Sequence, residues 1–322
     1  MRVVPIGHNR PVVGRSRTGA RCTGSLLAWL ARLLGVASAF AGRNPALVSW
    51  REDRFYRKVN RRLPALRIDC ANGLSWYVRP GDDFIGPSVV RTGAFEPEKV
   101  AAVLALLDGN GISLERLIDV GANIGTTTIE VLRRRPGVSA VAFEPDPRNF
   151  QLLRLNLIAN RFDRRVVAHR LALGQTDATL SFELSASNYG DHRVRLPGSG
   201  VPGGFDEQAR ETITVPGARL DDIAGLAVGP STLVFIDVQG FEGHVLAGAH
   251  RTLAARPAVA FEFWPYGLDR VDGRRRLYSA LAGYRRLFEI NSTPPRPLAL
   301  SELDDVAAAL PPAGHTDLLA LP

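Results

Sequence analysis

Four carboxylates stand at the ends of short apolar runs that have the length of buried strands: Asp119, Glu144, Asp237 and Glu262. In open α/β sheets the carboxyl ends of the strands share one edge, and the ligand cleft lies beyond that edge. The four acids are therefore predicted to meet at one cleft. There, carboxylates can accept hydrogen bonds, attract a cation or take up a proton.

The first of these acids opens a glycine-rich turn, LIDVGANIG at 117–125. Gly121 permits a sharp turn, and Gly125 lets a helix begin near Thr126 with its free N–H groups aimed at an anionic group. Glu144 follows Gly125 by nineteen positions and can accept hydrogen bonds from two ribose hydroxyls. This spacing predicts a pocket for a nucleoside-bearing cofactor.

The turn discriminates between two cofactor classes. Dinucleotide sites use G-x-G-x-x-G, in which the second glycine lets the backbone approach a pyrophosphate. In this chain Ala122 and Asn123 follow Gly121, and Asn123 stands where a dinucleotide site has its second glycine. S-adenosylmethionine has no phosphate and carries a sulfonium, which suits an acid-rich loop, so the pattern favours it. Pro145 holds Glu144 in extended backbone, and Asp146 is predicted to cap the next helix.

Four segments occur in a fixed order: IDVGANIG at 118–125, FEP at 143–145, RLDDI at 219–223 and IDVQGFEGHVLAGA at 236–249. The set closely resembles the FkbM family of S-adenosylmethionine-dependent methyltransferases. GAFEPEKV at 93–100 resembles the start of that domain, and Glu262 matches its late acidic strand end. The resemblance covers about residues 67–322. It implies O-methylation, often of sugar or polyketide hydroxyls, and an adenine lined by Ala172 and Leu173.

Two positions depart from the family pattern. The family usually has a lysine and a glutamate where this chain has Phe235 and Gln239. Two interpretations stay open: an unusual acceptor, or a scaffold that binds the cofactor but catalyses poorly.

A base near the methyl group would assist transfer to a hydroxyl, because hydroxyls are weak nucleophiles. Asp237 is the first candidate for that base and Glu262 the second. His192 is a third candidate if its loop folds over the cleft. Glu242 is explained as well by the first turn of a helix, where a carboxylate complements the helix dipole. Asp221 is predicted to cap a short helix leading toward residue 224.

Apolar runs and helical stripes alternate from residue 115 onward. They predict an α/β fold with a doubly wound, mostly parallel, seven-stranded, Rossmann-like sheet of the class I methyltransferase type. The expected strands are 116–120, 138–144, 165–171, 232–238, 258–263, 285–290 and an antiparallel 316–321, and the expected helices are 124–135, 147–160, 240–255 and 271–283.

Three parts are expected along the chain: a basic N-terminal arm at 1–62, a cover segment at 63–114 with a helix near 96–108, and a methyltransferase domain at 115–322. Within the domain, an excursion at 174–231 interrupts the alternation. Its PGSGVPGG run at 197–204 suits a disordered connection, and its residues 187–194 suit a lid over the acceptor.

The positive charge is concentrated in the arm, which has thirteen Arg and Lys against two Asp and Glu, whereas the remainder is mildly acidic. Nucleic acid is therefore a disfavoured partner, although an RNA or DNA methyltransferase remains the alternative function. A small-molecule or glycan acceptor is expected, and the oligomeric state is left open.

Two cysteines and no metal-binding histidine spacing fit a cytoplasmic enzyme without a metal site. The apolar helix expected at 25–41 contains Arg32, which disfavours a spanning segment. Attachment of this helix to a membrane surface is a hypothesis.

Overall fold

The computed structural model describes residues 2–5, 65–198 and 207–322. The apolar helix expected at 25–41 and most of the PGSGVPGG run lie outside these residues. Among the helices that are described, none combines the length and the apolar character needed to cross a bilayer.

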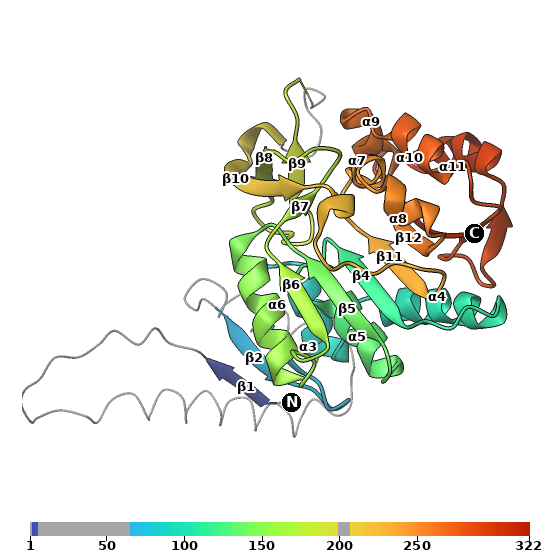
Figure 1. Cartoon of the computed structure of the whole chain (residues 1–322). Coiled ribbons are helices and arrows are strands. Elements are labelled where there is room, and N and C mark those ends of the chain that lie inside the picture. The colour runs from blue at the N-terminus through green and yellow to red at the C-terminus, as the bar shows by residue number, and fades with distance from the viewer. Residues whose placement is uncertain (1, 6–64, 199–206) are drawn as a thin grey trace, which may run out of the picture.

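The central sheet has eight strands in the order β14-β13-β15-β12-β11-β4-β5-β6 (Figure 1). Their bounds are β4 Arg116–Val120, β5 Ser139–Phe143, β6 Val166–His169, β11 Thr232–Ile236, β12 Ala258–Phe263, β13 Arg286–Glu289, β14 Arg296–Leu298 and β15 Thr316–Leu321. Strands β6, β5, β4, β11 and β12 pair in parallel, and β15 is antiparallel to both β12 and β13. The doubly wound class and the antiparallel last strand are confirmed.

The eighth strand corrects the predicted number of seven. Strand β14 pairs antiparallel with the outer side of β13. Its three residues include Pro297. A short run that contains proline does not predict a strand from the sequence, although proline is tolerated at a sheet edge.

Helices cover both faces of the sheet because the strands are apolar on both faces. Along β4, Leu117 faces one cluster and Ile118 faces the other. On the first face lie α4 (Pro97–Gly109), α5 (Thr126–Arg134) and α6 (Pro147–Ala159). On the second face lie α7 (Glu242–Ala247), α8 (His250–Ala254), α10 (Arg274–Leu281) and α11 (Leu303–Ala309). Two short helices complete the set: α9 (Pro265–Arg270), which the sequence did not predict, and the 3₁₀ turn η3 (Leu300–Glu302).

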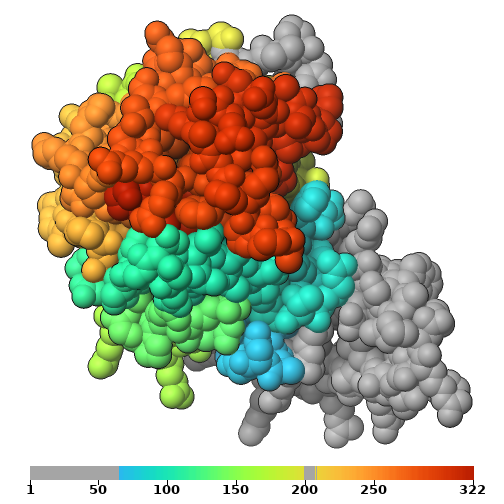
Figure 2. All heavy atoms as spheres, turned by 90° about the vertical axis from the view of Figure 1, so that its right-hand side faces the viewer, coloured from blue at the N-terminus to red at the C-terminus, as the bar shows by residue number. Residues whose placement is uncertain are grey.

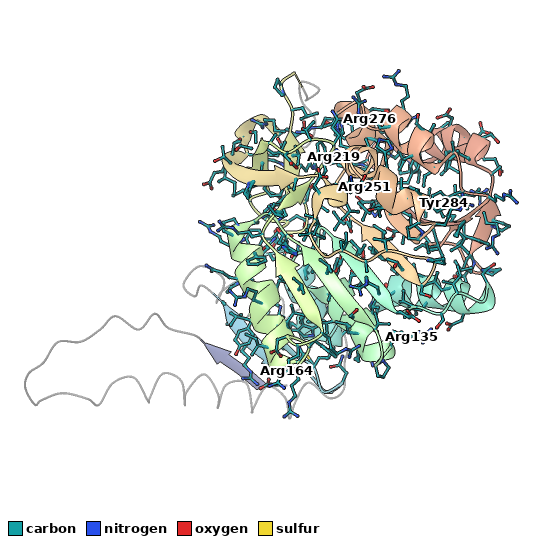
Figure 3. All side chains as sticks on the ribbon, in the orientation of Figure 1. Arg135, Arg164, Arg219, Arg251, Arg276 and Tyr284 are labelled. Atoms are coloured by element: carbon teal, nitrogen blue, oxygen red, sulfur yellow. The ribbon has the colours of Figure 1, made fainter. Side chains whose placement is uncertain are left out.

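The single helix expected at 240–255 is wrong, because the chain divides into α7 and α8. A Cβ on Gly248 would lie 2.0 Å from the carbonyl oxygen of Gly174, so the chain passes this point only without a side chain. Asp221 then caps α8, since its carboxylate accepts the N–H groups of Arg251 and Thr252, each at 2.9 Å. Asp221 therefore caps α8 rather than the turn toward residue 224; Arg219 and Arg251 lie at this junction (Figure 3).

The excursion at 174–231 forms a second sheet with β7, the strand just before it, in the order β7-β10-β8-β9. Its strands are β7 Ala172–Leu173, β8 Thr179–Leu184, β9 Arg193–Arg195 and β10 Glu211–Ala218, with the 3₁₀ turns η1 (Glu207–Ala209) and η2 (Leu220–Asp222). Buried ion pairs fix it to α9: Arg270 lies 2.8 Å from Glu183 and 3.1 Å from Glu207. The described part of the excursion is thus an ordered wall.

Ahead of the domain, β1 (Arg2–Pro5), β2 (Leu66–Asp69) and β3 (Ser75–Val78) form a three-stranded sheet, followed by α3 (Ile85–Thr92). Asn156 of α6 joins β3 to the body, because it accepts the N–H of Tyr77 at 2.5 Å and donates to the carbonyl of Tyr77 at 3.2 Å. Helix α4 begins and ends one residue later than expected. In the space-filling view, the teal segment that includes α4 packs directly against the red C-terminal part (Figure 2).

Replacing Glu183 by Ala is expected to lower the free energy of unfolding by about 3–5 kcal/mol, because it removes one of the two carboxylates that pair with the buried Arg270 guanidinium and the one that pairs with Arg195. Urea denaturation measures the change. Asp269→Ala is the control, since Asp269 pairs with Arg274 at 2.5 Å but has a side chain 57% exposed, and it should cost about 0–1 kcal/mol. Equal losses in the two variants would contradict the role of the buried pair.

Candidate active site

Two hollows lie beyond the carboxyl edge of the central sheet. The inner pocket is lined by residues that include Glu144, Pro145, Asn149, Ala172, Leu173 and Phe241. The outer cleft is lined by residues that include Lys99, Asp119, Ala122, Thr126, Gln239, Glu262 and His315. Gly121, Asn123 and Asp237 line both hollows, so the two meet there. The structure thus gathers the four strand-end acids, with Glu144 in one hollow, Asp119 and Glu262 in the other, and Asp237 at the junction.

Backbone hydrogen bonds at the glycine-rich turn hold the ends of neighbouring strands together at this junction. The N–H groups of Gly121 and Ala122 both donate to the carbonyl of Phe143, and the N–H of Asp237 donates to that of Val120. Gly121 has φ 89°, and a Cβ there would lie 1.9 Å from the carbonyl oxygen of Asp237. Glycine is therefore required for β4 and β11 to end side by side. At Gly125, by contrast, an added Cβ would meet Leu153 of α6, so this glycine serves helix packing.

Glu144 is held by the turn it faces. One carboxylate oxygen accepts the N–H of Asn123 at 2.9 Å, and the other accepts the N–H of Asp146 at 2.8 Å. Burial raises the pKa of Glu144 to about 8, against the opposing effect of those two N–H groups. Each oxygen of an ionised carboxylate can accept a second hydrogen bond. Glu144 can therefore still receive two donors from a molecule in the inner pocket.

Two amide side chains face this pocket with buried oxygens that have no partner. Asn123 and Asn149 both donate from Nδ2 to the carbonyl of Tyr189, at 2.9 and 3.0 Å. These bonds fix the orientation of both amides, and each Oδ1 is left buried without a hydrogen bond. Buried polar groups normally have partners. The orphaned oxygens are consistent with a ligand that brings hydrogen-bond donors.

Asp119 lies under the start of α5. Its carboxylate accepts the hydroxyl of Thr128, and burial raises its pKa to about 7 while that hydrogen bond lowers it. Thr126, the first residue of α5, is nearly buried and lines the outer cleft. Helix α6 begins as predicted, with Pro147 in its first turn and Asp146 capping it by accepting the N–H of Arg148 at 2.6 Å.

Gln239 joins the two acceptor-side acids. Its Nε2 donates to Asp237 Oδ1 at 2.8 Å and to Glu262 Oε2 at 3.0 Å. Its φ of 57° is left-handed, a conformation that side-chain-bearing residues adopt at a cost and that concentrates at functional sites. Burial, followed by the charges of Asp237 and Glu242, raises the pKa of Glu262 well above its usual value. The neutral amide thus bridges two carboxylates without adding a third negative charge.

His192 lies between the excursion and the start of α6. Its Nδ1 accepts the N–H of Ser185 at 3.0 Å, and its Nε2 lies 3.1 Å from Asp146 Oδ2. The ring lines both hollows. His192 thus ties the excursion to the start of α6, and its role as a base stays a prediction.

The sequence interpretation did not single out Lys99 or Tyr189. Lys99, on α4, lies 2.8 Å from Glu96 and 2.9 Å from Asp317 and lines the outer cleft. Lysine is otherwise found only at position 58, and this rarity was the one available signal. Tyr189 contributes a backbone carbonyl, which has no signature in a sequence.

A Rossmann-like sheet with a pocket at the strand-end acid Glu144 and an acidic cleft beside it has the class I methyltransferase architecture. Residues 119–286, just over half of the chain, match the family model described as the methyltransferase FkbM domain. The chain belongs to the FkbM methyltransferase family, which confirms the resemblance noted in the sequence.

Two curated relatives are similar over part of the chain. A Beauveria bassiana protein, "Methyltransferase 1", is 27% identical over 143 residues, which cover 41% of this chain and 57% of the relative. The "2-O-methyltransferase NoeI" of Sinorhizobium fredii is 28% identical over 155 residues, covering 46% and 62%. The matches therefore span less than two thirds of either relative. The structure of a Bacillus cereus O-methyltransferase in complex with SAH is 14% identical, with a TM-score of 0.39 and coverage of 92% and 99%.

Glu242 offers a test of charge burial at this edge. Its Oε1 accepts the N–H groups of Val238 and Gly240, while its buried Oε2 has no partner. Burial raises the pKa of Glu242 from 4.5 to about 8. Between these values the folded state holds the proton that the unfolded chain has released, so stability falls as pH rises.

Glu242→Gln should be as stable as the wild type near pH 5 and more stable by about 1–3 kcal/mol near pH 9. Urea denaturation at the two pH values measures the difference. Glu130→Gln is the control, because Glu130 is paired with Arg133 and Arg134 and its pKa is lowered. If the free energy of unfolding fell equally in the wild type and in Glu242→Gln between pH 5 and pH 9, the raised pKa of Glu242 would be contradicted.

Proposed function

We propose that the chain is an S-adenosylmethionine-dependent O-methyltransferase acting on a hydroxyl of a sugar, glycolipid or polyketide-like molecule. The observation that carries the proposal is the position of Asp237, which lies where the inner pocket opens into the outer cleft. A group at that junction can lie beside both a bound cofactor and an acceptor.

The inner pocket fits the adenosyl part of the cofactor by its hydrogen-bonding character. Glu144 would accept from the ribose hydroxyls, and the orphaned oxygens of Asn123 and Asn149 would accept further donors. The buried side chains of Leu173 and Phe241 would cover the flat adenine ring. Asp119 and the start of α5 would face the amino-acid end.

The outer cleft fits an acceptor that donates hydrogen bonds. Asp237, Glu262 and Glu96 all line it, and ionised carboxylates only accept. Hydroxyl groups of a sugar would satisfy such a surface. The printed name of the Sinorhizobium relative, a 2-O-methyltransferase, agrees with transfer to oxygen.

The cofactor, when bound, supplies an electrophilic methyl group. The protein holds the acceptor oxygen in line with it, which removes much of the entropic barrier. Asp237 would take the acceptor proton as the oxygen attacks, and the Gln239 amide would fix the orientation of this carboxylate through its 2.8 Å bond. Gln239 thus has a positioning role, which favours a working enzyme over the scaffold interpretation.

Calorimetric titration with S-adenosylmethionine and S-adenosylhomocysteine tests the cofactor. Glu144→Gln should weaken the binding of both ligands by about 10- to 100-fold. The amide N–H₂ would face a backbone N–H and could not accept a hydrogen bond from the ribose. Glu130→Gln, a matched change on α5 outside both hollows, should bind like the wild type. A wild-type protein that binds neither compound would refute the proposal.

Asp237→Asn should retain cofactor binding and reduce methyl transfer by about 10²- to 10⁴-fold, the usual contribution of a general base. Transfer of a radiolabelled methyl group to a panel of sugars, glycolipids and polyketide alcohols measures it. Asp222→Asn, at the exposed end of the excursion, is the control. Unchanged turnover in Asp237→Asn would remove Asp237 from the chemistry.

A further inference from the structure

The segment 147–170, which contains α6 and the edge strand β6, differs in charge from the rest of the methyltransferase domain. It holds six arginines against one acid, Asp163, whereas the remainder of 115–322 has more Asp and Glu than Arg and Lys. Five of its arginines are exposed: Arg148, Arg154, Arg161, Arg164 and Arg170. None of these five pairs with an acid among the described residues, whereas the three arginines at the end of α5 all pair with Glu130 or Asp108. The fold therefore does not use the positive charge of this segment in ion pairs.

Exposed apolar side chains occur in the same segment. Four large apolar side chains of the described residues are exposed, and three of them, Leu155, Ile158 and Val167, belong to it. Single exposed apolar residues are common on protein surfaces, but these lie among the exposed arginines. Leu155 and Ile158 are three positions apart, so they are neighbours on the side of α6 opposite the buried Leu157. The outer face of α6 consists of Arg148, Gln151, Arg154, Leu155, Ile158 and, just after the helix, Arg161.

The outer face of α6 extends to the mouth of the outer cleft. Helix α6 flanks the edge strand β6 at the outside of the body (Figure 1). Arg148, in the first turn of α6, lines the outer cleft. Phe84, the fourth exposed large apolar residue, also lines this cleft, just before α3. The rim by which an acceptor would enter thus has the same mixture of basic and apolar side chains as the helix.

Charge and polarity together favour one kind of partner for this face. The N-terminal arm of the chain is itself rich in arginine, so like charges disfavour it as a cover. A second copy that placed the same face against itself would also bring like charges together. Nucleic acid would pair with the arginines through its phosphates but would leave Leu155 and Ile158 without an apolar contact. An anionic lipid surface satisfies both kinds of side chain, because its headgroups attract arginines and its interfacial layer accepts apolar groups.

We propose that the outer face of α6 docks the protein on an anionic lipid surface, with the mouth of the outer cleft toward the headgroup layer. Docking does not depend on methyl transfer and so goes beyond the proposed function. Its consequence for the acceptor does rest on that function: a hydroxyl carried by a lipid headgroup would enter the cleft from the docked position.

Sedimentation of the full chain with vesicles tests docking. The wild type should bind vesicles of phosphatidylcholine mixed with phosphatidylglycerol more tightly than vesicles of phosphatidylcholine alone. Arg154→Gln/Arg161→Gln should weaken binding to the mixed vesicles by about tenfold or more, because each arginine near an anionic surface adds to the attraction. The control is Arg275→Gln/Arg285→Gln, which removes the same charge from exposed arginines on α10 and shortly after it and should bind like the wild type. The N-terminal arm is identical in all these proteins, so its contribution does not change.

Leu155→Gln/Ile158→Gln distinguishes a lipid surface from other polyanions. This variant keeps every charge, so it should bind a single-stranded RNA as the wild type does. It should weaken binding to the mixed vesicles by about threefold or more, because apolar area no longer leaves water. The difference should be clearest at high salt, where the arginines are screened. Urea denaturation should give wild-type stability for both α6 variants, since all four side chains are exposed.

Docking is overturned if the wild type does not sediment with the mixed vesicles, or if either α6 variant sediments as the wild type does. Loss of RNA binding in the arginine variant, together with unchanged vesicle binding in the apolar variant, would assign the face to nucleic acid instead. A wild-type dimer that Leu155→Gln/Ile158→Gln converts to a monomer would assign it to a second copy and equally overturn the proposal. Failure of the wild type to bind S-adenosylmethionine, by contrast, would refute the proposed function and leave docking standing.

Discussion

The structure depends on one constraint: the carboxyl edge of the central sheet must hold several carboxylates out of water. Asp119, Glu144, Glu242 and Glu262 are all nearly buried, and burial raises the pKa of each. An isolated buried charge is costly, so each acid needs donors supplied by the fold. The turns after β4, β5 and β11 supply backbone N–H donors to Glu144 and Glu242. Asp119 and Glu262 receive side-chain donors instead, from Thr128 and Gln239.

The groups that balance the buried carboxylates differ between the two hollows. In the inner pocket the acid Glu144 is balanced by backbone N–H groups, which carry no net charge and leave room for further hydrogen bonds. In the outer cleft, side chains do this work: the Gln239 amide bridges two acids, and the Lys99 ammonium bridges two others.

The sequence predicted the parts of this arrangement that are local. Asp119 and Glu144 end strands whose apolar character defines them, and the Asp146–Pro147 pair marks the start of α6 by its own chemistry. Contacts between distant segments were out of reach. The break at Gly248 is set by the carbonyl of Gly174, and the position of Lys99 depends on how α4 packs against β11. The neighbours of His192, Ser185 and Asp146, could not be predicted either, because they come together only in the folded chain.

The excursion acts as a fixed wall of the site. Tyr189 accepts from two asparagines of the body, His192 meets the cap of α6, and the Arg79 guanidinium lies 3.7 Å from the centre of the Tyr189 ring. Asp146 serves both sides at once, since it caps the helix that follows Glu144 and pairs with His192. Its pKa is low because His192 and the N–H of Arg148 outweigh its burial. A shift of residues 187–193 would therefore also disturb the backbone that holds Glu144, so the walls of the inner pocket and of the outer cleft share the same supports.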